Sequence, residues 1–411
     1  MALVLPFAAV RPLRQFVSQV AALPYDVMTR KEAKIVAKNN LLSFLHVEKS
    51  EIDVPDHIKS NDTLIYETAK SNFGQMLGKG ILKQDQSPCF YIYRQHMDRK
   101  IQTGIVGVVS AREYDEGIIK KHELTRQDKE EDRIDHVNTV NAQTGPVFIT
   151  YSSRAKLNAL VEQAAASDPE YNFIADDGVI HTVWIVSDAA KIEEIKQEFL
   201  AVKSLYIADG HHRAAAACAV ARMRRESDKS PEMREYEKVL AVLFPHNQLR
   251  IMDYNRAVKD LNGLTPREFQ EKISCRFTIK QNFAEKSPQK FHDFGMYLQG
   301  QWYQLTIKEG VYNDRDPVAR LDAAILQDHL LAPVLGINNP RTDDRILFCG
   351  GIRGMAELEK LVNKDGYAVA FSLYPTTIEQ VMQVADAGAI MPPKSTWFEP
   401  KLRSGIFVHK L

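Results

Sequence analysis

The chain has 411 residues, of which 45% are hydrophobic, 9% aromatic and 26% charged, a composition that indicates a folded globular protein. This composition excludes a disordered, collagen-like or small disulfide-stabilised chain. The 53 Lys and Arg residues balance the 53 Asp and Glu residues, so no chain-wide electric field would attract a nucleic acid or an anionic membrane.

The cysteines and the apolar segments predict a cytoplasmic protein. The four cysteines are far apart and form no CxxC pair, which argues against a structural zinc cluster or a secreted disulfide framework. The apolar N-terminal segment has no preceding basic residue and is interrupted by Pro6, so no secretory signal is expected. No stretch approaches the roughly 20 apolar residues of a membrane span. A membrane or nucleic-acid partner is therefore not expected, whereas a homo-oligomer remains open.

The first 250 residues predict a mixed α/β (α+β) domain. Runs of β-branched and aromatic residues bounded by turn residues predict strands over residues 89–95, 103–111, 146–151, 181–187, 204–209 and 238–245. Ala-rich and charged segments with helical apolar spacing predict helices over residues 31–40, 153–167 and 213–227. The apolar segment 43–47 is interpreted as a strand that carries His46, more typical of a satisfied core histidine than of a reactive one.

A second, smaller module is predicted over residues 251–411. Segments 277–281 and 295–308 resemble a small antiparallel hairpin layer. Helical and strand-like segments then alternate to the end, as in an α/β unit with crossover connections. The last twenty residues contain prolines, cations and Trp397, and we expect them to dock as a rigid tail on this module.

The clearest local motif is Asp209-Gly210-His211-His212-Arg213, between a buried strand and an Ala-rich helix. A strand that turns through glycine into a helix brings free backbone N–H groups and the positive helix end to one point, an arrangement that binds phosphate. Arg213 could make a bidentate phosphate contact, and a histidine could transfer a proton. The alternative is structural: Asp209 caps the helix, one histidine packs in the core and Arg213 is a surface cation.

A second polar cluster spans residues 122–133 and follows a strand-like segment. Its functional candidates are Glu123, Thr125, Arg126, Lys129 and Arg133. The competing interpretation is a self-neutralising surface helix that begins near Arg126.

Weaker candidates lie elsewhere. Asp26 follows Pro24 and Tyr25 in a loop that could contact a nucleoside, or could simply lead into the next helix. Lys394, Ser395 and Thr396 could meet an anion, and the turn at 350–354 could hold a phosphate, although a glycine pattern alone is a weak signal.

These motifs together resemble the bacterial and archaeal family known as domain of unknown function 1015. The resemblance rests on PYDV (24–27), SFLHV (43–47), HELTRQDKEEDR (122–133), IADGHHRAAAA (207–217), GGIRG (350–354) and MPPKSTWFEPKLRSG (391–405). More distantly, the DGHHR segment resembles the phosphate-binding turn of the ParB and sulfiredoxin superfamily, which includes a free serine kinase that uses ADP. This likeness implies a ParB/sulfiredoxin-like nucleotide-binding core in residues 1–250.

The resemblance implies that Gly210, His211, His212 and Arg213 hold nucleotide phosphates. Arg126, Lys129 and Arg133 would add positive charge, with ATP or ADP and Mg²⁺ as cofactors. A sulfiredoxin-like activity is disfavoured because His211 stands where a reactive cysteine would be needed. No protein metal ligand is predicted.

Two functions remain open. The first is a phosphotransferase or nucleotide hydrolase that acts on a small hydroxylated metabolite such as free serine. Its proton acceptor would be Glu123, with Asp26 and Asp209 as rivals and His212 as a further catalytic candidate. The second is a non-catalytic nucleotide- or metabolite-binding regulator. No P-loop or kinase Gly-rich loop is present, which excludes an ordinary ATPase or protein kinase.

Overall fold

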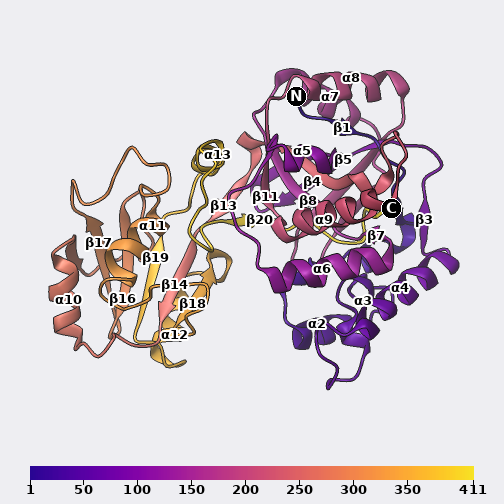
Figure 1. Cartoon of the computed structure of the whole chain (residues 1–411). Coiled ribbons are helices and arrows are strands. Elements are labelled where there is room, and N and C mark those ends of the chain that lie inside the picture. Colours follow the sequence, from indigo (N-terminus) through magenta and orange to yellow (C-terminus); the bar gives the residue numbers. More distant parts are fainter. The chain divides into compact units, whose positions relative to one another are not determined.

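The chain folds into two compact units, and the computed structural model describes all residues from 1 to 411 (Figure 1). The first unit contains Met1–Leu249 together with Pro400–Leu411, and the second contains Arg250–Glu399. The prediction that the C-terminal tail belongs to the second module is wrong. The tail returns to the first unit because Val408 exchanges backbone hydrogen bonds with Val10, and neighbouring tail residues are fully buried there.

A large mixed sheet forms the centre of the first unit. Its strand order is β6-β11-β8-β12-β5-β4-β10-β9, with β1 added beside β5. The strands are β1 (Val4–Leu5), β4 (Phe90–Met97), β5 (Lys100–Ser110), β6 (Ile119–Lys120), β8 (Val147–Tyr151), β9 (Tyr171–Ile174), β10 (Ile180–Val186), β11 (Leu205–Asp209) and β12 (Lys238–Pro245). β11 pairs in parallel with β6, β12 pairs in parallel with β8, and the other pairs are antiparallel. All six predicted strands are present, and the mixed α/β class is confirmed.

Helices and short strands surround this sheet. The helices are α1 (Val17–Val20), α2 (Arg30–Ala37), α3 (Leu45–Glu48), α4 (Thr63–Gly78), α5 (Ala111–Asp115), α6 (Gln127–Val140), α7 (Ala155–Ala164), α8 (Ala189–Leu200) and α9 (His211–Ser227). The short strands pair as β2 (Val10–Pro12) with β3 (Leu82–Gln84), and β7 (Ala142–Gln143) with β21 (His409–Lys410). α6 lies between α9 and the α2–α4 group (Figure 1).

The predicted strand at residues 43–47 is wrong, because this segment forms α3. The Ser43 hydroxyl accepts a hydrogen bond from the N–H of Leu45 at 3.3 Å, and the N–H of Glu48 donates to the carbonyl of Phe44 at 2.8 Å. A short apolar run does not distinguish a strand from a buried helical turn by periodicity, so the local serine turn decided the outcome.

The two faces of the large sheet bury different partners. Phe90 and Ile92 of β4 belong to the core that contains the apolar side chains of α7, α8 and α9. Tyr91 and Tyr93 point to the opposite face, as alternation along a strand requires, and both rings contact Phe407 of the C-terminal tail. The tail therefore completes the core of the first unit.

The second unit is built on a six-stranded antiparallel sheet with the order β15-β17-β16-β19-β14-β18. Its strands are β14 (Tyr254–Val258), β15 (Phe277–Gln281), β16 (Asp293–Leu298), β17 (Gln301–Ile307), β18 (Ile346–Gly350) and β19 (Val369–Leu373). Its helices are α10 (Pro266–Ser274), α11 (Asp322–Leu326), α12 (Met355–Asn363) and α13 (Ile378–Asp386), and β13 (Arg250–Met252) pairs with β20 (Trp397–Glu399).

The α/β unit with crossover connections that the sequence predicts for the second unit needs one correction. β18 and β19 run in the same direction and are joined through α12, but β14 lies between them and pairs antiparallel with both. The alternation of strand, helix and strand in the sequence predicted the crossover from β18 to β19. It did not predict that β14, an earlier strand, inserts between β18 and β19.

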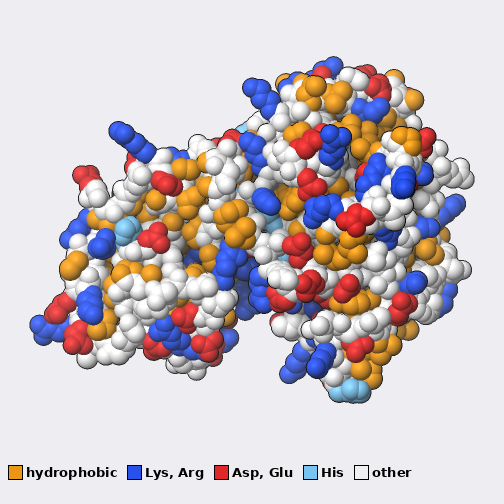
Figure 2. All heavy atoms as spheres, viewed as in Figure 1, with side chains coloured by type: hydrophobic (Ala, Val, Ile, Leu, Met, Phe, Trp, Pro, Cys, Tyr) orange, Lys and Arg blue, Asp and Glu red, His pale blue; other side chains and the backbone are white.

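The surface carries no large region of one charge on the face shown in Figure 2, where acidic and basic side chains are interspersed. None of the helices combines the length and the apolar character needed to cross a lipid bilayer.

Candidate functional site

The strand-to-helix turn at residues 209–213 is shaped by Gly210. β11 ends at Asp209, Gly210 has φ 87° and ψ 33°, and α9 begins at His211 with no side chain capping it. A Cβ atom on Gly210 would lie 3.0 Å from the guanidinium carbon of Arg213. The left-handed conformation and this close contact together require glycine at the position.

Arg213 lies against the turn as a half-buried cation. Its Nη1 donates to the carbonyl of Pro146 at 2.5 Å, while its Nε has no hydrogen-bond partner. Burial by itself would lower the pKa of Arg213, but the carboxylates of Asp26, Asp209 and Glu48 outweigh burial and raise it. The guanidinium therefore stays charged beside the positive end of α9.

A small cavity joins Arg213 to α6. Its lining residues are Glu48, Arg133, His136, Val137, Gln143, Thr144, Gly145, Val147 and Arg213. Arg133 pairs with Asp132 at 2.8 Å, and its guanidinium lies 4.1 Å from the ring centre of Tyr25. The free space is about 20 Å³, room for a water molecule. Two arginines thus meet at one cavity.

Several residues around this cavity belong to no recognisable sequence motif. Glu48 is 2% exposed and accepts a hydrogen bond from the hydroxyl of Thr144. A Cβ atom on Gly145 would lie 3.0 Å from the Ser404 hydroxyl of the C-terminal tail. No motif identifies these residues, because they meet only through the packing of α3, α6 and the tail. The one sequence feature that could have pointed to the cavity was the position of Glu48, a charged residue directly after the apolar segment 43–47.

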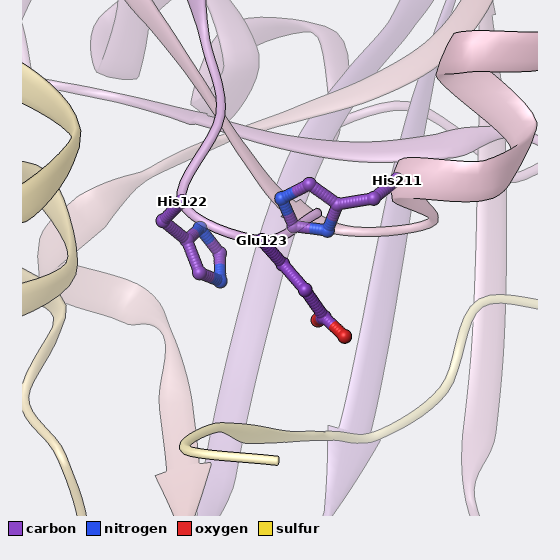
Figure 3. A group of neighbouring side chains, drawn as sticks. All are labelled: His122, Glu123 and His211. Atoms are coloured by element: carbon purple, nitrogen blue, oxygen red, sulfur yellow. The ribbon is translucent and has the colours of Figure 1, made fainter. Parts of the chain in front are cut away.

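A second cluster lies at the same sheet edge and consists of His122, Glu123 and His211 (Figure 3). β6 pairs in parallel with β11, so the residues that follow the two strands come to one edge. One potential ligand atom from each side chain lies within 4.8 Å of the others. Burial lowers the pKa of His122 to about 3 and that of His211 to about 4, so both rings are neutral at neutral pH.

Asp209 and His212 have different surroundings from this cluster. Asp209 forms an ion pair with Lys401 at 3.2 Å and accepts a hydrogen bond from the N–H of Gly210. Burial opposes ionisation, but Lys401 and Arg213 outweigh it and hold the pKa of Asp209 well below its usual range. His212 is half-buried in the first turn of α9.

The start of α6 faces water. Arg126 is the N-cap residue and forms an exposed ion pair with Asp128 at 2.8 Å, and the hydroxyl of Thr125 donates to Glu130 at 2.6 Å. Lys129 is also exposed. The structure therefore brings Arg133 to the cavity and leaves Arg126 and Lys129 outside its lining.

Several of the weaker candidates make contacts within the fold that explain them. A Cβ atom on Gly350 would lie 2.8 Å from the Trp397 ring, which explains a glycine there without a phosphate. The hydroxyl of Ser395 donates to the carbonyl of Pro392 at 2.7 Å, and the carbonyl of Lys394 accepts a hydrogen bond from Arg256. His46 lies in α3, and its Nδ1 pairs with Asp53 at 2.9 Å.

Solved structures give only a distant likeness. Free serine kinase in complex with AMP is 12% identical, with 71% of this chain and 86% of that chain covered and a TM-score of 0.37. SbnI with a C-terminal truncation, from Staphylococcus aureus, is 11% identical, with coverage of 72% and 82% and a TM-score of 0.38. A conserved hypothetical protein from Pyrococcus furiosus is 12% identical, with coverage of 74% and 94% and a TM-score of 0.36.

No curated protein matches the sequence at a significant level. One family model does match, over residues 4–324, and its description is "Protein of unknown function (DUF1015)". The matched range includes the 122–133 segment and the 209–213 turn. The chain therefore belongs to the DUF1015 family.

Proposed function

We propose that the protein binds a nucleotide at the start of α9 and transfers a phosphoryl group to a small hydroxylated metabolite such as free serine, or hydrolyses the nucleotide. The observation that carries this proposal is the meeting of Arg133 and Arg213 at one cavity, beside a helix start that no side chain caps. Catalysis of phosphoryl transfer requires mainly that the protein position the substrates and neutralise the charge of the phosphates. Two guanidinium groups and a helix N-terminus would supply this.

The resemblance of the DGHHR segment to the phosphate turns of the ParB and sulfiredoxin superfamily supports the same assignment. In this proposal Gly210, His211, His212 and Arg213 contact the phosphates of ATP or ADP. Mg²⁺ would accompany the phosphates and supply charge neutralisation, while Arg133 would bind from α6.

Nucleotide binding requires the cavity to open. The free space of about 20 Å³ holds one water molecule, whereas small-molecule sites are typically roughly 300 Å³ or larger. The side chains of Arg133 and Arg213 are long and could move toward an entering phosphate. This need for rearrangement favours a second candidate function, in which nucleotide binding is a regulatory signal without turnover.

Three carboxylates are candidates for the proton acceptor in the phosphotransferase. Asp209 suits the role least, because its ion pair with Lys401 favours the unprotonated form. Glu123 lies beside His211, and Asp26 faces the charge of Arg213. Turnover measurements identify the proton acceptor, because loss of a general base lowers the rate by roughly 10²–10⁴-fold. The variants to compare are Glu123→Gln, Asp26→Asn and Asp209→Asn.

The direct test is a thermal-shift screen of the full chain with ATP, ADP, CTP and pyrophosphate, followed by phosphorus NMR with serine and Mg²⁺. A raised Tm with one nucleotide and a new phosphoester signal supports the phosphotransferase. A raised Tm without turnover of any nucleotide supports the regulator. If no nucleotide changes the Tm, both the phosphotransferase and the regulator are contradicted.

A further inference from the structure

We propose that His122, Glu123 and His211 form a binding site for a divalent transition-metal ion of the zinc type. This site goes beyond the proposed nucleotide function, because it needs no nucleotide to form. The two histidines and the glutamate come from two segments that lie far apart in the sequence and adjacent at one sheet edge (Figure 3).

The pairing of β6 with β11 explains why these residues meet. Ile119 and Lys120 pair in parallel with Leu205 and Tyr206. The chain leaves both strands at the same edge, so His122 and Glu123 follow β6 where His211 opens α9. The ring centres of His122 and His211 are 4.5 Å apart, with the ring planes at 90°.

The donor atoms can converge on one ion after a small movement. They lie within 4.8 Å of one another, whereas ligands about 2.0–2.2 Å from a tetrahedral zinc ion are separated by about 3.4 Å. Glu123 is only half-buried, so rotation of its side chain can shorten its distances to the two histidine nitrogens. Two buried imidazoles and one adjustable carboxylate make a practicable set of ligands.

Unpartnered nitrogen atoms are the second, independent observation. Nε2 of His211 is buried without a hydrogen-bond partner, and the ring nitrogens of His122 are buried and form no hydrogen bond of ordinary length and angle, although the ring lies near the backbone of Ile207; His122 and His211 are 2% and 7% exposed. A buried polar atom without a partner costs about 1–3 kcal/mol, so such atoms usually meet a ligand, water or ion. A metal ion at the centre of the cluster would satisfy one nitrogen of each ring.

The donor set selects the class of ion. Two imidazoles and one carboxylate are a common protein environment for Zn²⁺ and for Fe²⁺, whereas Mg²⁺ and Ca²⁺ prefer oxygen ligands. The site is therefore distinct from the Mg²⁺ proposed to accompany the nucleotide phosphates. If Glu123 and His211 bind the ion, Asp26 becomes the better candidate for the proton acceptor of the proposed reaction. The phosphates would then be contacted by Gly210, His212 and Arg213.

The test is zinc binding by the full chain after treatment with a chelator, measured by isothermal titration calorimetry without nucleotide. We expect one Zn²⁺ per wild-type chain. Substitutions His122→Ala, His211→Ala and Glu123→Gln should each weaken binding by at least about 100-fold, since even residues that only orient ligands change metal affinity by about 10–100-fold. Co²⁺ should give a visible absorption band in the wild type that each variant loses.

The control is His57→Ala, which removes an exposed histidine far from the cluster in sequence and should keep wild-type affinity. Circular dichroism checks that each variant folds. If a histidine variant does not fold, Glu123→Gln still tests the site, because Glu123 is only half-buried. Absence of stoichiometric binding by the wild type, or equal affinity in all four variants, would overturn the site. Because nucleotide is absent, this result is independent of the proposed nucleotide function.

Discussion

Gly210 determines the shape of the turn at residues 209–213 through a backbone conformation that other residues adopt only at a cost in free energy. We expect Gly210→Ala to destabilise the protein by about 1–2 kcal/mol, the cost of a left-handed residue with a side chain, plus the cost of displacing Arg213. Gly178→Ala is a matched control, because Gly178 has φ 80° with no atom near its Cβ position. Urea unfolding measures both, and an equal loss in the two variants would show that the contact with Arg213 has no effect.

Arg213 supplies a cation in the first turn of α9. We expect Arg213→Ala to weaken nucleotide binding by about 1.5–3 kcal/mol, the range for a hydrogen bond to a charged group. Arg222→Ala is the control, because Arg222 lies on the same helix and forms an exposed pair with Asp115. Calorimetric titration with the nucleotide identified in the screen measures the difference. Unchanged affinity in a folded Arg213→Ala protein would place the phosphates elsewhere.

Asp322 in the second unit makes stability depend on pH. One carboxylate oxygen accepts a hydrogen bond from the N–H of His292 at 2.9 Å, the other has no partner, and burial raises the pKa to about 7. The folded state therefore binds a proton that the unfolded state releases near pH 4, so stability falls as pH rises from about 4 to 7.

Asp322→Asn removes this titration. We expect the variant to gain stability relative to wild type, on the order of 2–4 kcal/mol, between pH 4 and pH 8. Denaturant unfolding at the two pH values measures the change. Asp328→Asn, at an exposed position in the same segment, controls for the loss of one negative charge. An equal difference between wild type and Asp322→Asn at both pH values would contradict the prediction.

Helix α6 presents different arginines to the cavity and to water. Arg133 lines the cavity, whereas Arg126 is exposed at the N-cap and paired with Asp128. We expect Arg133→Lys to weaken nucleotide binding by about tenfold, because lysine lacks the planar fork of donors, and Arg126→Lys to have little effect. Equilibrium dialysis of nucleotide against both variants measures this. A larger loss for Arg126→Lys would move the site toward the exposed start of α6.

Regular elements were predictable where a local pattern was sufficient. The strand that became β11 and the helix that became α9 were recognised from an apolar run, a glycine and an Ala-rich segment, each readable within a few residues. The prediction of a strand at residues 43–47 is wrong because five mostly apolar residues show no clear periodicity. In the second unit, no local signal could place β14 between β18 and β19.

At the scale of the whole molecule, the second unit has the properties of an independently folding domain. Its two ends meet, because Arg250 of β13 pairs with Glu399 of β20. Its core side chains, which include Phe269, Phe294 and Phe371, all lie between these ends. Because the two ends are paired, the second unit joins the rest of the chain at two points that are adjacent in space.

We therefore expect a chain of residues 250–399 to fold by itself. Circular dichroism and hydrogen exchange should show cooperative unfolding and protected amides in β16 and β19, the central strands of its sheet. A chain of residues 1–249 should be less stable than one in which a short linker joins residue 249 to residue 400, since the tail contributes buried Phe407. An unfolded 250–399 chain would show that this unit depends on the rest of the protein.

The sequence by itself determined the α/β class, six strands of the large sheet, and the turn at residues 209–213, because apolar periodicity and turn chemistry act over a few neighbouring residues. Tertiary structure alone decided that Glu48 and Ser404 lie beside Arg213, and that His122 and Glu123 lie beside His211. The latter contacts depend on which strands pair and on where the tail docks. The pairing of the strands and the docking of the C-terminal tail minimise the free energy of the whole core. No local sequence pattern therefore predicts them.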